Sequence, residues 1–490
     1  MPHAIVIGAG FASLSAATTL AQAGWQVTLL EKNDGPGGRA RVFEAQGFTF
    51  DMGPSWYWMP DVFEQYFNRF GKRVADYYDL VRLDPSYQVV FGENDTVSIP
   101  AGMAELRELF ERLEPGSAAQ LDKFLAQAKY KYEVGMNKFV HLPSRSVLEF
   151  IDWDIAKGAL RLDLLESMAK HARRFFSNPR LLKLIEFPVL FLGATPENTP
   201  ALYSLMNYAD LALGTWYPRG GMHQIVRGMV ALAQELGVRI EYNQEVREIV
   251  VAQGRATGVR TASNFWPADA VVAGADYQHI EQQVLASEHR HYSPQYWESR
   301  TMAPSSLLFY LGVNRKLANL EHHNLFFDED FSQHAHEIYE RPQWPSRPLF
   351  YASVPSKTDP TVAPAGQENL FLLIPVAPGL DDPDATREKY YDLLMERLEK
   401  HCGHPIRDAV VYKRSYAHRD FVADYHSFKG NAYGLANTLK QTAILKPSLK
   451  SRKVANLYFT GQLTVPGPGV PPSLISGQVV AGEVLKEIKS

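Results

Sequence analysis

The hydrophobic pattern at the start of the chain predicts a strand, a helix and a second strand in quick succession. Residues 4–7 (AIVI) form a continuous apolar run, which is typical of a strand buried on both faces. Gly8 and Gly10 follow, and apolar positions then recur with a helical period over residues 14–24, so that Gly24 ends the helix. Residues 25–30 (WQVTLL) predict the next strand, which leads into Glu31.

Two glycines and one acid in this unit fit a dinucleotide-binding fold. Gly8 would make the tight turn, and Gly10 would let the backbone approach a pyrophosphate. Glu31 follows Gly10 by 21 residues, the spacing at which a carboxylate accepts hydrogen bonds from a ribose diol. Ser13 stands where the pattern has its third glycine, which serves only helix–strand packing, so we expect this departure to affect packing and not binding. A glycine turn without a ligand is the alternative.

Later segments predict a hairpin, a second sheet and a helical region. Residues 238–262 alternate like a strand followed by a hairpin with its turn near Gly254, and residues 268–276 are typical of a buried strand. Residues 305–313 (SSLLFYLGV) and 369–376 (NLFLLIPV) are apolar runs that we expect in a second sheet. Between residues 117 and 214 the apolar positions recur with a helical period.

The composition argues against several classes of protein. With 46% apolar and 21% charged residues among 490, the chain has the balance of a globular protein and can bury a sizeable core. Its net charge of −4 gives no overall field that would attract nucleic acid. The single cysteine, Cys402, cannot form an internal disulfide and is expected to be buried. We see no signal peptide and no apolar run of about 18 residues, so we expect a soluble or peripheral protein.

Two further glycine-rich stretches carry a family resemblance. The second turn, KNDGPGGRARV over residues 32–42, precedes GFTFDMGPSW over residues 47–56. Residues 456–485 predict a strand, a Pro/Gly-rich loop and a helix starting near Pro472, whose N-terminus would offer free N–H groups and a positive dipole end to an electron-rich ring. Together these stretches resemble the FAD-dependent amine oxidase and carotenoid desaturase superfamily.

The resemblance implies FAD as the cofactor and assigns residues to it by their place in the motifs. Val246 would begin the stretch whose backbone meets the adenine, and Gly469 would lie with its neighbours along the flavin. The sequence departs from the family after the strand-exit glycine, where Gln462 and Leu463 replace an acidic or small polar residue. In the alternative without FAD, Arg39 and Arg41 are surface charges. The cofactor-binding residues implied are Gly8, Ala9, Gly10, Phe11, Ala12, Glu31, Lys32, Gly38, Arg39, Val246, Gly461, Val470, Pro471 and Ser473.

The predicted fold class is α/β, with a discontinuous Rossmann-like FAD-binding domain, a mixed-sheet substrate domain and a helical membrane-facing portion. We expect residues 1–60, 215–285 and 450–490 to form the FAD-binding domain. Residues 61–116 and 286–449 would form the substrate domain, and residues 117–214 the helical portion.

The central block ending in WYPRGGM (residues 216–222) is similar to the bacterial phytoene desaturase group, and this similarity runs over essentially the whole chain. It implies an FAD-dependent enzyme that introduces conjugated double bonds into an apolar C40 polyene, phytoene to lycopene. It also implies a cytoplasmic protein bound peripherally to the inner face of the cell membrane, since the substrate lives in membranes. Basic residues interleaved with aromatic ones in the helical region would face an anionic bilayer, or else form an ordinary solvated face: Lys129, Lys131, Lys138, Arg173, Arg174, Arg180 and Lys183.

The absence of other catalytic motifs fits this chemistry. No HExxH, CxxC or nucleophile elbow occurs, and the fifteen histidines show no metal spacing, so no metal is expected. Removing hydrogen from a saturated carbon–carbon bond needs a two-electron acceptor, which oxidised FAD provides by accepting a hydride. The base for the matching proton is unassigned, and the four candidates in the central block are Glu197, Asp210, Tyr217 and His223.

Two other functions stay open at this point. A flavin oxidase of a soluble amine or a porphyrinogen-type ring would use an aromatic cage, which Trp56 and Trp58 could supply. A non-catalytic relative that binds prenylated proteins would hold no flavin. The sequence leaves undecided the number and isomers of the new double bonds, a C40 or C30 substrate, the terminal electron acceptor and the oligomeric state.

Overall fold

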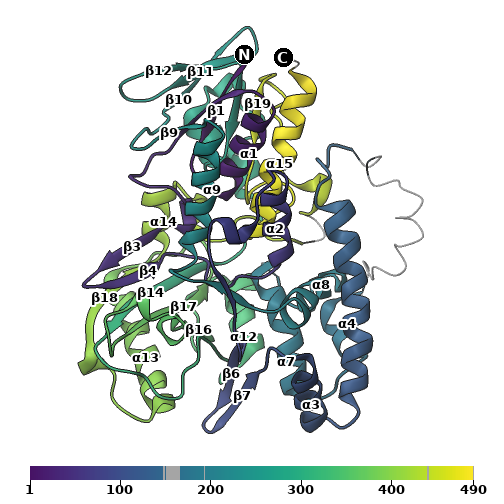
Figure 1. Ribbon diagram of the computed structural model, residues 1–490, viewed down its shortest axis with the longest axis vertical. Coiled ribbons are helices and arrows are strands. Elements are labelled where there is room, and N and C mark those ends of the chain that lie inside the picture. The colour runs from purple at the N-terminus through teal and green to yellow at the C-terminus, as the bar shows by residue number, and fades with distance from the viewer. Residues whose placement is uncertain (147–148, 150–165, 193, 439–440, 489–490) are drawn as a thin grey trace.

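The computed structural model describes residues 1–146, 149, 166–192, 194–438 and 441–488. It is an elongated molecule in which the two termini lie together at one end (Figure 1). Helices of the N- and C-terminal segments pack side by side at that end, and a large sheet occupies the lower left.

A five-stranded sheet draws its strands from the start, middle and end of the chain. Its order is β19–β13–β1–β2–β9, and all of its pairings are parallel. The predicted first and second strands are adjacent in it, and the run near residue 270 pairs with the first strand. The strands are β1 (His3–Ile7), β2 (Gln26–Leu30), β9 (Arg239–Glu241), β13 (Ala270–Ala273) and β19 (Leu457–Phe459). The discontinuous parallel arrangement predicted from sequence is therefore observed.

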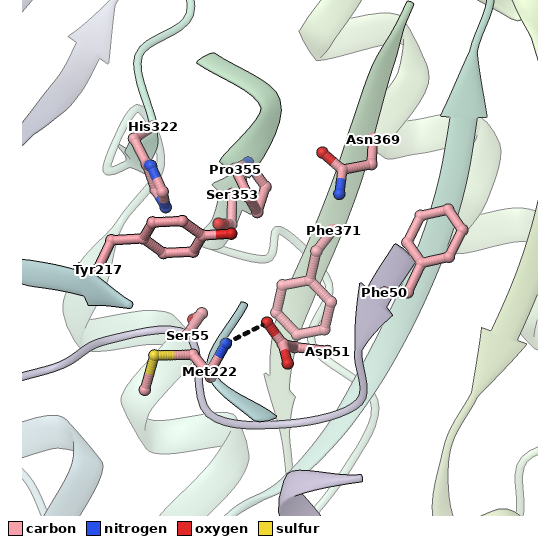
Figure 2. A pocket seen from close by; sticks show the side chains of 10 residues that line it. All are labelled: Phe50, Asp51, Ser55, Tyr217, Met222, His322, Ser353, Pro355, Asn369 and Phe371. Atoms are coloured by element: carbon pink, nitrogen blue, oxygen red, sulfur yellow. Dashed lines mark hydrogen bonds between the residues drawn. The ribbon is translucent and has the colours of Figure 1, made fainter. Parts of the chain in front are cut away.

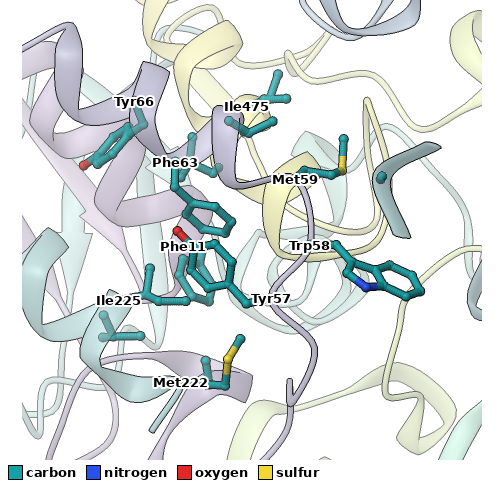
Figure 3. Close-up of a cluster of buried hydrophobic side chains, with 14 of the residues drawn as sticks. Phe11, Tyr57, Trp58, Met59, Phe63, Tyr66, Met222, Ile225 and Ile475 are labelled. Carbon is teal, nitrogen blue, oxygen red and sulfur yellow. The ribbon is translucent and has the colours of Figure 1, made fainter. Parts of the chain in front are cut away.

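Three helices pack around this sheet: α1 (Phe11–Gln22), α9 (His223–Glu235) and α15 (Val470–Glu487). Helix α15 begins at Val470, two residues before the predicted start. Gly477 lets α15 approach α1 closely, because a β-carbon there would stand 2.8 Å from the Ala16 nitrogen. Figure 3 shows the apolar cluster where these helices meet α2 (Pro60–Asn68), with Phe11, Phe63, Ile225 and Ile475 drawn from four separate segments.

A small antiparallel sheet follows β9 and joins it to β13. It has the order β10–β11–β12, with β10 (Glu248–Ala252), β11 (Arg255–Arg260) and β12 (Phe265–Pro267). Gly254 forms the turn between the first two strands at φ +72°, as the hairpin prediction requires.

The second large sheet has seven strands in the order β18–β14–β17–β16–β15–β6–β7. It is mixed, since β15 and β6 are parallel while the other neighbours are antiparallel. The predicted strand 305–313 is β14 with those bounds, and the predicted 369–376 is β17 with one more residue at its start. The strands are β6 (Tyr87–Gly92), β7 (Asp95–Ile99), β14 (Ser305–Val313), β15 (His323–Phe326), β16 (Phe350–Ser353), β17 (Glu368–Val376) and β18 (Val410–Tyr416).

Helix α13 (Asp384–Cys402) contributes to a separate hydrophobic core with this mixed sheet. Leu394 and Leu398 lie in that core with Leu372 of β17. Cys402 belongs to the same core and is buried, as expected. Burial raises the pKa of its thiol to about 12, so it is protonated at neutral pH.

Two short antiparallel pairs connect the sheets: β3 (Val42–Ala45) with β4 (Phe48–Asp51), and β5 (Leu80–Arg82) with β8 (Trp216–Pro218). Strand β4 contacts β17 of the mixed sheet, and the Tyr217 ring of β8 lies 4.7 Å from the ring of His322, just before β15. Shorter helices are α3 (Met103–Leu113), α10 (Tyr277–His279), α11 (Pro294–Glu298), α12 (Phe331–Ala335) and α14 (His418–Tyr425).

The helical prediction for residues 117–214 holds for the described part of that region. The elements are α4 (Ser117–Val134), η3 (Gly135–Phe139), α6 (Met168–Ala172), α7 (Pro179–Glu186), η5 (Phe187–Leu192), η6 (Ala201–Ser204), α8 (Leu205–Asn207) and η7 (Tyr208–Ala212). Within the described residues, we find no helix whose length and apolar character would let it cross a bilayer.

One of the basic residues assigned to a surface was placed wrongly. Lys131 is fully buried, and its ammonium donates to the Ala201 carbonyl at 3.0 Å and to the Ser204 hydroxyl at 3.2 Å. The helical period alone could not show this, because it does not reveal that another segment covers this face of α4.

The exposed basic residues of the helical region are largely matched by acids. Arg173, Arg174 and Arg180 each pair with a carboxylate at 2.6–2.8 Å, from Glu186, Glu166 and Asp95 respectively. Lys129 lies 3.8 Å from Glu133 on the same helix. These pairs reduce the net positive charge that this face presents.

Candidate functional site

The first glycine turn closes β1 onto α1. Gly8 has φ +91°, and its N–H donates to the Leu30 carbonyl at 2.8 Å. Gly10 precedes α1, and a β-carbon on it would meet nothing within 4 Å. The turn therefore leaves open space beside the Gly10 backbone and the first N–H groups of α1, which have no side-chain cap.

Ser13 occupies the position of the third glycine, and a glycine elsewhere in the chain makes room for its side chain. The serine is fully buried, and its hydroxyl donates to the Ile7 carbonyl at 3.3 Å. A β-carbon on Gly274, just after β13, would overlap the Ser13 Oγ. The space that the third glycine usually provides is thus supplied by a glycine on the neighbouring strand.

Glu31 at the end of β2 is tied to the glycine turn. It is 5% exposed; its Oε2 accepts from the Ala9 N–H at 2.7 Å and its Oε1 from the Asn33 N–H at 2.9 Å. Oε1 also accepts from the Asn33 side-chain amide at 3.0 Å, so Oε2 is the oxygen with a second lone pair that a ribose hydroxyl can use. The neighbouring Lys32 turns its ammonium to the carbonyl of Ala423, and burial lowers its pKa.

The second glycine turn lies against the first. The Gly37 N–H donates to the Ala9 carbonyl at 2.8 Å, and a β-carbon on Gly38 would stand 3.4 Å from the Gly10 Cα. Gly37 and Gly38 both have positive φ, at +114° and +54°. A side chain at Gly38 would fill the contact between the two turns, and a β-carbon at Gly37 would stand 2.9 Å from the Ala40 carbonyl oxygen.

Arg39, which follows this turn, is directed inward. Its guanidinium donates to the Ser427 hydroxyl at 2.9 Å and the Asn431 carbonyl at 3.3 Å, and it lies 5.4 Å from the centre of the Tyr425 ring. Burial lowers its pKa, with the Asp276 carboxyl opposing that shift. Its Nε is buried, and no group of the described residues accepts a hydrogen bond from it. The surface-charge alternative for Arg39 is therefore wrong, and an acceptor such as a phosphate or flavin oxygen would satisfy this donor.

The C-terminal stretch returns to the first turn. Gly461, at φ +105°, donates its N–H to the Ser476 hydroxyl at 3.0 Å, and a β-carbon on it would stand 3.8 Å from the Ala12 side chain. Gly469 has φ +110° and directly precedes α15, which has no side-chain cap. Val470, Pro471 and Ser473 form the first turn of that helix. Helix α15, which packs against α1, thus supplies a second positive helix end.

Gln462 stands where the family has an acidic or small polar residue, and it hydrogen-bonds Arg39. With its amide oxygen turned toward Arg39, it accepts from the guanidinium Nη2 at 2.9 Å. A neutral acceptor from the C-terminal stretch thereby meets the cation of the second glycine turn.

Val246, predicted to begin the stretch at the adenine, is buried in the core with Ile5 and Leu30.

An aromatic wall, defined here as Trp56, Trp58, Tyr87, Phe187 and His323, follows the second glycine turn. Trp56 stacks on His323 with ring centres 4.3 Å apart and planes 12° apart. It also lies 5.2 Å from Trp58 and 5.4 Å from Tyr87. Burial lowers the pKa of His323 well below its ordinary value, so its ring is neutral at physiological pH. The wall is therefore an uncharged cluster of aromatic rings, in which Trp56 is the partly exposed member and the other four are buried.

The four candidate bases have different surroundings. Glu197 is exposed, and the His223 Nδ1 is taken up by the Ala40 carbonyl at 2.8 Å. Tyr217 is buried, and burial raises the pKa of its hydroxyl above the ordinary range. Asp210 is 1% exposed; its Oδ2 accepts from the Tyr87 hydroxyl at 2.8 Å, while its Oδ1 is buried without a partner.

Burial raises the pKa of Asp210 to about 7. Since Tyr87 belongs to the aromatic wall, this carboxyl adjoins it. Among the four candidates, Asp210 alone combines burial with contact with the wall.

A cavity at the edge of the mixed sheet is too small for a long substrate. Figure 2 shows it between Tyr217, His322, Asn369 and Asp51, and its volume is about 20 Å³, room for roughly one water molecule. Asp51 accepts from the Met222 N–H at 2.7 Å and the His223 N–H at 2.9 Å, which fixes the start of α9. Burial raises the pKa of Asp51 to about 6. This acid has a positioning role that the sequence analysis did not identify.

No metal site accompanies these features: among the described residues, no group of three or more His, Cys, Asp or Glu side chains could hold a metal ion. Facing glycine turns, two uncapped helix ends, a ribose-type acid and an unsatisfied arginine nitrogen fit FAD. The fold and this site define a flavoprotein oxidoreductase.

Comparisons with known proteins agree with that class. The model of the family described as "Flavin containing amine oxidoreductase" matches residues 11–485. Among solved structures, an oxidoreductase from Methanosarcina mazei aligns over 98% of this chain and 100% of its own, with a TM-score of 0.61 and 17% identity. That likeness shows the shared fold.

Relatives with named activities identify the branch of this family to which the chain belongs. A carotenoid 3,4-desaturase from Haloarcula japonica is 42% identical, over 99% of this chain and 98% of its own length. A zeta-carotene-forming phytoene desaturase from Myxococcus xanthus is 32% identical, over 98% and 93%. A 4,4'-diapophytoene desaturase from Staphylococcus haemolyticus is 34% identical, over 99% of each. This chain belongs to the bacterial carotenoid desaturase family and is an FAD-dependent oxidoreductase acting on CH–CH bonds.

Proposed function

We propose that this chain desaturates phytoene stepwise to lycopene, with FAD as the acceptor of hydrogen. The observation that carries the proposal is the uncharged aromatic wall, whose first member, Trp56, follows Gly53 by three residues. A hydrocarbon offers no polar group to bind, so stacking on such a wall is the interaction available to it. Two of the relatives above are named for phytoene-type substrates.

The chain's own residues would bind, orient and move a proton. Oxidised FAD supplies a two-electron acceptor when bound. Glu31 and Arg39 would hold its ribose and an anionic or carbonyl oxygen, while the other glycine-turn and C-terminal residues predicted from sequence would line it. The aromatic wall would align the polyene and exclude water. Asp210, with a pKa of about 7, can take up the proton that the substrate loses.

A second reaction is favoured by one specific observation. The 42% identity to a carotenoid 3,4-desaturase exceeds the 32% and 34% to the phytoene-type relatives. The same site would then remove hydrogen from the end of an already conjugated polyene.

Pigment analysis distinguishes these functions. In cells that accumulate colourless phytoene, the chain should produce a red pigment with the absorption spectrum of lycopene. The matched control is Gly10→Leu, which should fold because a β-carbon there meets no atom within 4 Å, yet should block the pyrophosphate and give no pigment. If phytoene is unchanged while lycopene fed to the cells gains conjugation, the 3,4-reaction is correct. Peroxide release with a soluble amine and no action on either carotene would contradict both.

We also propose that the protein binds peripherally to the cytoplasmic face of the membrane, where its substrate resides. Support comes from an exposed apolar pair, Ile444 and Leu445, whose exposed fractions are 39% and 50%. Replacing both with Asp should reduce co-sedimentation with phosphatidylglycerol vesicles, because two charges would enter the bilayer surface. Val422→Asp, at an equally exposed apolar residue on α14, is the control and should bind normally. Equal binding by the double variant would refute this contact.

A further inference from the structure

Lys446 carries a buried amino group that no described residue hydrogen-bonds. The residue is 5% exposed, and its Nζ has no hydrogen-bond partner in the part of the chain that the structure describes. It lies beside Gly467 in the C-terminal loop: a β-carbon on that glycine would stand 2.9 Å from the Lys446 Nζ. The segment is held in place by the Thr464 hydroxyl, which donates to the Pro447 carbonyl at 2.7 Å.

A second unsatisfied polar atom faces the same point. The Asn437 Oδ1 is buried without a partner and would stand 3.0 Å from the same Gly467 β-carbon. Burying an unpaired charge is costly, and buried polar groups in native proteins are nearly always hydrogen-bonded. Burial is the only cause that lowers the pKa of Lys446, to about 7, so no carboxylate offsets it. A partner from outside the chain would remove this cost.

The position of Gly467 indicates what that partner is. It lies two residues before Gly469, whose uncapped helix α15 presents a positive end at the proposed flavin position. We propose that the Lys446 ammonium is the counter-charge for the negative charge that bound FAD gains on two-electron reduction. The inference rests on the proposed placement of FAD.

The charges balance in this assignment. A hydride from a C–H bond carries two electrons and one proton, so bound FAD would gain one negative charge on accepting it. The substrate carbon becomes cationic, and the adjacent C–H bond then breaks to form the double bond and release a proton. With a pKa of about 7, Lys446 is only partly protonated at neutral pH; a nearby negative charge would raise that pKa, so its amine fraction would take up a proton from solvent. Reduction of bound FAD is thereby made more favourable.

The test measures the equilibrium constant for two-electron reduction of bound FAD against a redox dye at pH 7. Lys446→Met should lower this constant at least about tenfold, which is about 30 mV for a two-electron couple. Lys446→Arg should stay within about threefold of the wild type, because it keeps the charge. Lys453→Met, which removes an exposed lysine of the same region, is the matched control and should have no effect.

Further variants distinguish a failure of this inference from a failure of the proposed function. Methionine replaces an unpaired buried charge with an apolar chain of similar length, so Lys446→Met should fold. Asn437→Asp should lower the constant as well, since a carboxylate beside Lys446 would neutralise it. An unchanged constant in Lys446→Met overturns this inference and leaves the proposed function intact. A wild-type protein that binds no FAD overturns both.

Discussion

Gly477 of α15 lies so close to Ala12 of α1 that a β-carbon on the glycine would overlap the Ala12 carbonyl oxygen. The two helices carry the two ends of the chain into one site. Gly477→Ala should therefore push α15 away from α1, cost about 1–3 kcal/mol in the free energy of unfolding and weaken FAD binding. Urea unfolding and FAD titration measure the two effects.

Gly482 on the same helix provides the control. A β-carbon there meets nothing within 4 Å, so Gly482→Ala should stabilise the protein by up to about 1 kcal/mol, the helix propensity difference. If the two variants behaved alike, the helix contact would not be tight.

The Glu31 carboxylate supports both the glycine turn and the proposed ribose contact. Glu31→Gln removes the charge and replaces one acceptor with a donor that faces a backbone N–H. Charge-assisted hydrogen bonds are worth about 1.5–3 kcal/mol, so the dissociation constant for FAD should rise roughly 10- to 100-fold. Glu241→Gln, at the end of the adjacent strand β9, should leave it unchanged. Normal FAD affinity in Glu31→Gln would exclude a ribose role.

The raised pKa of Asp210 predicts that the free energy of unfolding depends on pH. Its pKa is raised from 3.8 to about 7 by burial. Below about pH 4 it is protonated in both states and has no effect. Between about pH 4 and 7 the unfolded chain loses a proton that the folded protein retains, so stability falls as pH rises, by at most roughly 4 kcal/mol.

Asp210→Asn cannot ionise, so it should match the wild type near pH 4 and exceed its unfolding free energy by up to about 4 kcal/mol at pH 8. The measurement is urea unfolding of both proteins across this range. A stability difference that does not change with pH would show that Asp210 ionises freely when folded.

The elements that the sequence predicted correctly are those that depend on neighbouring residues. The β1–α1–β2 unit follows from adjacent residues, and β14 and β17 from continuous apolar runs. Lys131 was placed wrongly because a helical period does not show what covers the helix. Gly477 was not identified because its close neighbour, Ala12, stands at the other end of the sequence. Lys446 was missed because an isolated lysine in the sequence gives no sign of burial.

Ser13 and Gly274 form a pair whose packing is testable by a double-mutant cycle. Gly274→Ala alone should destabilise the protein by about 1–3 kcal/mol, since its β-carbon would overlap the Ser13 Oγ. Ser13→Gly alone should cost about 1 kcal/mol, because glycine is unfavourable inside α1. In the double variant the overlap is gone, and the remaining neighbour of the new β-carbon is the Ile7 carbonyl oxygen at 3.2 Å.

The double variant should therefore be more stable than the sum of the single costs predicts, with a coupling of at least about 1 kcal/mol measured by urea unfolding. FAD affinity should change little, because neither side chain lies on the open side of the Gly10 turn. Additive costs would mean that the strand exit relaxes away from α1, and that Gly274 does not replace the third glycine.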